Sequence, residues 1–168
     1  MQTKVFLRSS LKRVASCSGY SLVELLIVSA ILMILASAVV PLSKVTVQRQ
    51  KEAELRRSLR EVRLAIDRYK DAVDLGAIGR TDSVGGDEGY PPSLGMLVEG
   101  AEVLNDPTGR RLKFLRQIPI DPITKSKNWG LRSYQDDQFS TRWSGGNVYD
   151  VYSLSNGVAL DGTRYREW

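Results

Sequence analysis

Residues 20–75 decide the fold, and they read YSLVELLIVSAILMILASAVVPLSKVTVQRQKEAELRRSLREVRLAIDRYKDAVDL. This stretch contains no glycine and a single proline, Pro41. Because glycine and proline are the residues that most often end a helix, their near absence predicts one long helix. The two halves of this helix differ in character and therefore predict different surroundings.

The first half of the predicted helix suits a lipid environment. Residues 22–40 are apolar except for Glu24, Ser29 and Ser37. At ~1.5 Å per residue these residues span about 28 Å, close to the ~30 Å thickness of the hydrocarbon core of a bilayer. We therefore expect residues 20–42 to form a transmembrane and assembly segment.

The second half of the predicted helix, residues 43–75, is amphipathic. Its apolar residues recur at steps of three and four, which places them on one helical face. They are Leu55, Leu59, Val62, Ile66, Tyr69 and Val73. Charged residues lie between them, and Glu52 and Arg56 have the spacing of an ion pair within the helix. We predict that the apolar stripe packs against the rest of the chain.

Residues 76–168 have the composition of loops and short strands. They hold 13 of the 14 glycines and five of the six prolines, which favour turns. The patterns predict a short helix at 93–99, a helix or strand at 112–118, and strands at 131–134, 148–154 and 165–168. The dipeptides Asn156–Gly157 and Asp161–Gly162 indicate turns. One long helix packed on a small antiparallel sheet is an α+β fold.

The composition excludes several kinds of chemistry. The chain has no histidine and one cysteine, Cys17, which excludes histidine-based catalysis and an intramolecular disulfide. No nucleophile is paired with a base and no glycine-rich phosphate loop occurs, so we do not expect an enzyme. The net charge of +5 comes mostly from residues 1–19, whereas the rest carries 20 basic and 19 acidic residues. This balance does not indicate a nucleic-acid partner.

The N-terminal sequence is compatible with three different cleavage signals. A secretory signal peptide would end at residues 36–38, but Glu24 interrupts its apolar run and the helical pattern continues beyond that cut. A lipoprotein signal would end at Cys17, but the residues before it are basic instead of apolar. The third interpretation is cleavage after Gly19, because Gly19-Tyr20-Ser21-Leu22-Val23-Glu24 follows a short basic leader, residues 1–19.

This six-residue motif resembles the type III signal of type IV pilins and type II secretion pseudopilins. That signal has a glycine before the cut, an aromatic residue after it, and a glutamate four residues beyond the aromatic residue. Pro41 also falls where many members of the family have a proline. The resemblance implies a pilin-like fold, cleavage between Gly19 and Tyr20, and N-methylation of Tyr20 by a prepilin peptidase/methyltransferase.

The carboxylate of Glu24 needs a partner inside a membrane. A charge at the centre of a transmembrane helix costs roughly 2.5–3.5 kcal/mol, and less near its end. Cleavage creates a partner, the new α-amino group of Tyr20, but within one helix this amine points away along the axis. In a helical stack, Glu24 of one copy can meet the amine of its neighbour and set the axial register. The alternative is that Glu24 snorkels to the interface without a partner.

The C-terminal sequence is similar to that of major pseudopilins. The similarity lies at residues 88–94, 118–122, 129–134, 149–157 and 167–168. Many type IV pilins close a C-terminal loop with two cysteines, and the chain after Gly19 has none. The resemblance thus implies a structural subunit of the type II secretion pseudopilus, a periplasmic helical fibre that drives protein export. The alternative is a major or minor pilin of a type IV pilus, for motility, adhesion or DNA uptake.

The resemblance also implies partners and a location. The partners are other copies of the chain, minor pseudopilins, the prepilin peptidase/methyltransferase and an inner-membrane secretion platform, with a separate ATPase motor. The basic leader places the N-terminus in the cytoplasm and residues 76–168 in the periplasm by the positive-inside rule. The orientation that this rule predicts is opposed by positive charges on the other flank of the apolar segment, at Lys44, Arg49 and Lys51.

Two ligand hypotheses concern the C-terminal part. Major pseudopilins often bind calcium in the loop that follows residues 149–154, where Asn156 and Asp161 are the oxygen-bearing side chains. The alternative is that these residues only form turns. Lys125, Lys127, Trp129 and Arg132 would be the face of a binding module for single-stranded DNA, although such a cluster is more often ordinary surface.

Overall fold

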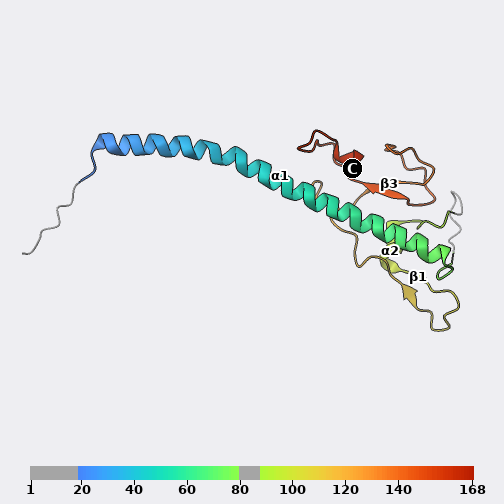
Figure 1. Ribbon diagram of the computed structural model, residues 1–168. Coiled ribbons are helices and arrows are strands. Elements are labelled where there is room, and N and C mark those ends of the chain that lie inside the picture. Colours follow the sequence, from blue (N-terminus) through green and yellow to red (C-terminus); the bar gives the residue numbers. More distant parts are fainter. Residues whose placement is uncertain (1–18, 80–87) are drawn as a thin grey trace, which may run out of the picture. The chain divides into compact units, whose positions relative to one another are not determined.

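The computed structural model describes residues 19–79 and 88–168, without the side chains of residues 38–43. Nearly all of the predicted leader therefore lies outside the described residues. The chain divides into two compact units, Met1–Leu42 and Ser43–Trp168. Together the elements make an α+β, pilin-like fold with one long N-terminal helix and short antiparallel strands (Figure 1).

The long helix α1 runs over Leu22–Asp74, so the predicted single helix is confirmed. The backbone N–H of Leu25 donates to the carbonyl of Ser21 at 3.1 Å and opens the first turn. Pro41 lies inside α1, and its side chain is outside the described residues. The helix ends at Asp74, and Gly76 follows with φ +68°, a conformation that glycine adopts without strain.

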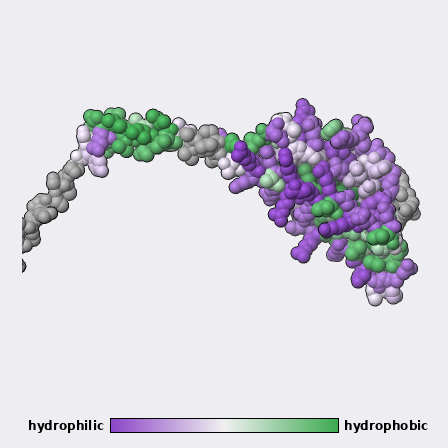
Figure 2. All heavy atoms as spheres, in the orientation of Figure 1, coloured by the Kyte–Doolittle hydropathy of each residue, from purple (hydrophilic) through white to green (hydrophobic). Residues whose placement is uncertain are grey.

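The described part of α1 in the first unit exposes apolar side chains on all sides, and Figure 2 shows it almost uniformly hydrophobic. Its two serines satisfy their hydroxyl groups inside the helix. Ser29 Oγ donates to the carbonyl of Leu25 at 2.6 Å, and Ser37 Oγ donates to that of Ile34 at 2.7 Å. Among residues 19–79 and 88–168, no helix has an apolar run long enough to cross a membrane.

The second unit has its core on the predicted face of α1. All six residues of the predicted stripe are buried, with Leu55, Ile66 and Val62 at most 1% exposed. The other core residues come from the loops and strands that follow. They include Ile78, Leu97, Leu115, Trp129, Val148, Val151, Ala159 and Tyr165. Burial of this stripe is what joins residues 88–168 to the helix.

Two strand pairs and two short helices make up the rest of this unit. Helix α2 covers Leu94–Glu99, as predicted, and Ser93 caps it by accepting from the N–H of Met96. Strand β1 (Ala101–Glu102) pairs with β2 (Arg111–Leu112), and β3 (Gly130–Arg132) pairs with β4 (Asp150–Tyr152). Both pairs are antiparallel, and they form two separate ribbons in place of one small sheet.

The pairing of β3 with β4 requires glycine at position 130. A Cβ atom there would lie 2.2 Å from the ring of Tyr152, its partner across the ladder. The ring of Tyr152 therefore lies directly over the backbone of β3. The guanidinium of Arg132 stacks on the same ring at 4.2 Å from its centroid.

Two expectations for short elements were wrong. Residues 165–168 form no strand; Tyr165–Glu167 is the 3₁₀ helix η1, in which the Glu167 N–H donates to the carbonyl of Arg164 at 3.0 Å. Its turn lets Trp168 fold back edge-on against Tyr165, with ring centroids 5.2 Å apart. Of residues 112–118, only Leu112 is in a strand, because Phe114 and Leu115 instead donate their N–H groups to the carbonyl of Leu97.

The predicted ion pair between Glu52 and Arg56 does not form either. Arg56 instead pairs with Asp161 at 3.1 Å. Glu52 accepts hydrogen bonds from Gln48, from the N–H of Leu160 and from the hydroxyl of Tyr165. Each of these two side chains thus bonds to the C-terminal loop, residues 158–165, instead of bonding to the other.

Candidate functional site

The predicted cleavage site is accessible. Gly19 and Tyr20 precede the first turn of α1, both are exposed, and no atom outside the neighbouring residues lies within 4 Å of where a Gly19 Cβ would be. Tyr20 is 80% exposed. Gly19 and Tyr20 thus form an exposed, non-helical stretch directly before the helix begins.

Glu24 lies in the first turn of α1 and is exposed, four residues after Tyr20. A carboxylate in the first turn is favoured by the helix dipole. Glu24 is also the only charged residue among positions 22–37. The serine hydroxyl groups of this segment bond to carbonyl groups of their own helix, whereas the carboxylate has no such partner among the described residues. Glu24 is therefore the group that an external amine would satisfy.

A polar edge of α1 holds the C-terminal loop. Gln48, Glu52 and Arg56 follow one another at one helical turn each and all bond to residues 158–165. Gln48 donates to the hydroxyl of Tyr165 at 3.2 Å, and Glu52 accepts from that hydroxyl at 3.0 Å. Burial raises the pKa of the Tyr165 phenol, and the carboxylate of Glu52 raises it further. We call these three residues of α1 the polar edge.

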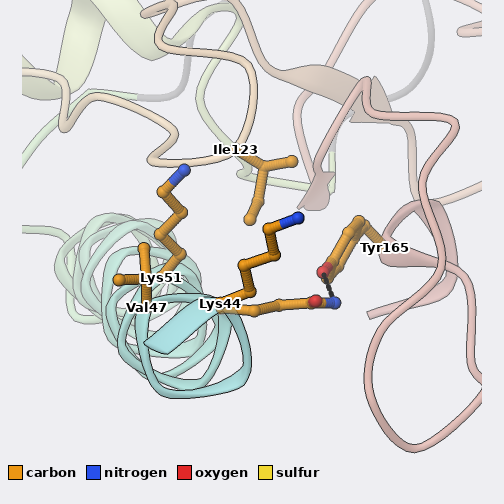
Figure 3. A pocket seen from close by; sticks show the side chains of 6 residues that line it. Lys44, Val47, Lys51, Ile123 and Tyr165 are labelled. Carbon is orange, nitrogen blue, oxygen red and sulfur yellow. Dashed lines mark hydrogen bonds between the residues drawn. The ribbon is translucent and has the colours of Figure 1, made fainter. Parts of the chain in front are cut away.

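The groove beside the polar edge is the apolar pocket of Figure 3. It has a volume of about 430 Å³ and is lined by the apolar side chains of Val47 and Ile123, by the ring of Tyr165, and by Lys44 and Lys51. Gln48 also lines this groove and donates to the hydroxyl of Tyr165. The groove is open to solvent, and its lining residues include no carboxylate.

The two side chains expected to bind calcium already have other hydrogen-bonding partners in the structure. The carboxylate of Asp161 accepts from the N–H and hydroxyl of Thr163, at 2.9 and 2.6 Å, and pairs with Arg56. Asn156 accepts a hydrogen bond from Arg166 through its amide oxygen. A cation would have to displace two guanidinium groups from these oxygens. Among residues 19–79 and 88–168, no group of three or more acidic or cysteine side chains is placed to hold a metal ion.

The proposed face for single-stranded DNA does not form as a surface. Trp129 is buried, and its indole N–H donates to the carbonyl of Pro119 at 3.0 Å. Arg132 is 4% exposed and bonds to Asp150 and to the carbonyls of Ser140 and Arg166. Lys125 and Lys127 are exposed. Trp129 and Arg132 are thus buried in contacts within the fold and do not form part of a surface.

Two acidic residues that organise the fold, the buried Asp121 and the half-buried Asp150, were not predicted from the sequence. Asp121 is fully buried, accepts from the N–H of Ile123 at 2.7 Å, and accepts from the hydroxyl of Ser153 at 2.6 Å. Asp150 bonds to Arg63 at 2.6 Å and to Arg132 at 3.1 Å. The short Pro-x-Asp-Pro sequence at 119–122 was the available signal for Asp121; no local pattern marks Asp150.

Comparison with known protein families supports the N-terminal site. A family described as "Prokaryotic N-terminal methylation motif" matches residues 15–40, the segment that contains Gly19, Tyr20 and Glu24. No curated protein and no solved structure matches the chain. The chain therefore carries a type IV pilin-like prepilin signal, and this signal supports a membrane-anchored, self-assembling, structural protein.

Proposed function

We propose that this protein is a structural subunit of a type II secretion pseudopilus. In this proposal the chain is cut after Gly19, methylated on Tyr20, and held in the inner membrane by residues 22–40 in a single pass. Residues 43–168 then face the periplasm, and copies stack through their N-terminal helices into a short fibre that acts in protein export. The subunit itself is not an enzyme.

The observation that carries the proposal is the coincidence of the methylation motif with a lone carboxylate. The motif spans residues 15–40, and Glu24 is the single charge in the largely apolar and exposed helical segment 22–37. A helix that is apolar on all sides must be covered by lipid or by other helices. In a stack of copies, both the apolar surface and Glu24 find partners, the latter in the amine of Tyr20.

Processing of the signal and assembly of the fibre each require partner proteins in this proposal. A prepilin peptidase/methyltransferase processes the signal, and an inner-membrane platform with minor pseudopilins starts and extends the fibre. Absence of cysteine after Gly19 favours the pseudopilus over a type IV pilus, because a disulfide-closed C-terminal loop is impossible here.

Deletion of the gene in its own host tests the proposal. The secreted proteome and the sheared surface fibres of the deletion strain are compared with those of the parent and of a complemented strain. We expect exported proteins to accumulate in the periplasm while surface pili remain. Intact secretion with loss of pili or twitching motility would instead identify a type IV pilin, and no change in either would refute a role in both.

A further inference from the structure

A basic groove lies on the outward face of α1, opposite the buried stripe, and has a volume of about 540 Å³. Four arginines line it, and they are Arg57, Arg60, Arg68 and Arg116. The rest of the lining consists of Glu61, Leu64, Phe114 and Leu115. All four arginines are exposed, and none of them forms an ion pair with a residue in 19–79 or 88–168. Because one glutamate stands against four arginines, the lining has a net charge of +3.

Both walls of the groove are held in place by the fold. One wall is α1 itself. The other wall is residues 114–116, where the backbone N–H groups of Phe114 and Leu115 donate to the carbonyl of Leu97 at 3.0 and 2.9 Å. The ring of Phe114 also packs edge-on against Tyr69 of α1, with ring centroids 5.2 Å apart. A ligand therefore meets a preformed surface and loses little affinity to ordering it.

The groove combines unpaired positive charge with an exposed apolar side chain. Arg57 and Arg60 lie one helical turn apart, and like charges at this spacing repel each other. Leu64 lies between Arg60 and Arg68 along α1 and is 53% exposed. An anionic ligand would relieve the repulsion, and an apolar group on the same ligand would cover Leu64. The lining thus favours a ligand that is both acidic and apolar.

We propose that this groove binds an extended acidic segment of a different protein, in which an apolar residue lies between carboxylates. From Arg57 to Arg68 the groove follows 11 residues of α1, which is about 16 Å. An extended chain rises about 3.3 Å per residue, so about five residues fill this length. The carboxylates pair with the guanidinium groups, which can hold them through two parallel hydrogen bonds. The inference goes beyond the proposed function and holds for a pseudopilin and a pilin alike.

Three features favour a protein segment over a nucleic acid. Glu61 lies in the lining and repels a continuous phosphate backbone. Phe114 is half-buried against Tyr69 and is not an open platform for stacking a base. Residues 20–168 carry 20 basic and 19 acidic side chains, so no strong field attracts a polyanion to this part of the chain.

A second copy of this chain matches the groove less well, because its acidic residues do not form a free extended segment. Among residues 19–79 and 88–168, the one pair of adjacent acidic residues is Asp136–Asp137. Asp136 already accepts from the N–H of Ser133 at 2.7 Å. Asp71 and Asp74 are held in α1 and therefore belong to a helix instead of an extended chain.

Peptide binding to the detergent-solubilised full chain tests the proposal. The probe is a fluorescently labelled peptide with two glutamates on each side of a leucine. Fluorescence anisotropy should show saturable binding that weakens as salt is added, because salt screens exposed charges. A peptide with glutamines in place of the glutamates and a peptide with serine in place of the leucine should both bind more weakly. Absence of binding by the acidic peptide would overturn the proposal.

Variants of the chain assign the binding to the groove. Arg57→Gln/Arg60→Gln removes two positive charges and should weaken binding of the acidic peptide roughly tenfold. Arg111→Gln/Arg142→Gln changes two exposed arginines outside the lining, and this matched control should bind like the unmodified chain. Both variants should keep the melting temperature of the unmodified chain, because none of these arginines is in an ion pair with a described residue. Equal weakening in the two variants would place the peptide elsewhere and refute the site.

A photo-reactive amino acid in place of Leu64 identifies the occupant of the groove in the host. We expect cross-linked peptides from a protein other than this chain, with acidic residues around an apolar residue. The same group in place of Leu112, an exposed leucine of β2, is the control and should not give this product. Cross-links mainly to another copy would make the groove a contact between copies. A double-stranded DNA oligonucleotide that displaces the acidic peptide would assign the groove to a nucleic acid, and either result overturns the proposal.

Discussion

The Nε atom of Arg63 in α1 lies 2.6 Å from Oδ1 of Asp150 at the start of β4. The other carboxylate oxygen of Asp150 accepts from Arg132 of β3 at 3.1 Å. One carboxylate thus joins the long helix to both strands of the β3–β4 ribbon. Arg63 also donates to the carbonyls of Val151 and Trp168, so the same guanidinium holds the strand and the C-terminal residues.

Removal of the charge at Asp150 should destabilise the second unit. In Asp150→Asn the buried guanidinium of Arg132 loses its only carboxylate among the described residues, and an unpaired buried charge costs about 3 kcal/mol. Urea unfolding of the detergent-solubilised full chain, followed by tryptophan fluorescence, measures this loss. Asp106→Asn is the control, since its pair with the exposed Arg110 is screened by solvent and should contribute much less to stability. Equal effects of the two changes would contradict this role of Asp150.

Glu24 should be needed for assembly and not for processing. In Glu24→Ala the cleavage site at Gly19 is untouched, so membrane insertion and cleavage proceed while fibres are lost. Ser29→Ala is the control, because its hydroxyl bonds only to the carbonyl of Leu25 in its own helix. Immunoblots for the cleaved chain and electron microscopy of fibres measure the two steps. A normal fibre yield from Glu24→Ala would rule out a pairing with the amine of Tyr20.

Acid should loosen the C-terminal loop through Asp161. The hydroxyl and then the N–H of Thr163 hold the pKa of the Asp161 carboxyl below its ordinary value, and Arg56 lowers the pKa further. A carboxyl with a lowered folded-state pKa stabilises the fold above its unfolded value, about 3.9, and this stabilisation is lost as the pH falls through the folded value.

Melting temperatures between pH 5 and pH 2 measure this contribution. We expect Asp161→Asn to lose less stability over this range than the unmodified chain does. Asp137→Asn, which changes an exposed carboxylate outside any described ion pair, should follow the unmodified chain. Parallel curves for all three would show that Asp161 does not couple folding to protonation.

Calcium binding by the C-terminal loop stays a prediction, and Arg56 makes it testable. A ligand that binds only the folded state raises the melting temperature. Because Arg56 already pairs with Asp161, we expect little shift for the unmodified chain between millimolar calcium and chelator. If Asp161 is a ligand, Arg56→Gln should reveal a larger shift. No shift in either protein would exclude a calcium site formed by Asn156 and Asp161.

The long helix and its buried face could be predicted because both depend on local patterns. The absence of breakers between residues 20 and 75 set the length of α1, and the three–four spacing from Leu55 to Val73 set the face that is buried. The short helix expected at 93–99 is also local, and it forms as α2 with Ser93 as its N-cap. The N-terminal motif is local as well.

The C-terminal contacts could not be predicted because they join residues far apart in the chain. The partners of Gln48, Glu52 and Arg56 lie more than 100 residues away, so their spacing within the helix suggested only an internal ion pair. The aromatic residues at 165 and 168 suggested a strand, but burial of Tyr165 against the polar edge of α1 favours a 3₁₀ turn. Trp129 and Arg132 looked like surface residues for the same reason.

The polar edge of α1 also constrains the order in which the chain can fold. The hydrogen-bonding partners of Gln48 and Arg56 lie 117 and 105 residues downstream. This side of the helix therefore has no partner until nearly the whole chain has been synthesised. At roughly 5–20 residues per second, that delay is on the order of several seconds. Contacts between such distant residues form slowly. During this interval the exposed helix is open to chaperones and proteases, and docking of the C-terminal loop ends that vulnerability.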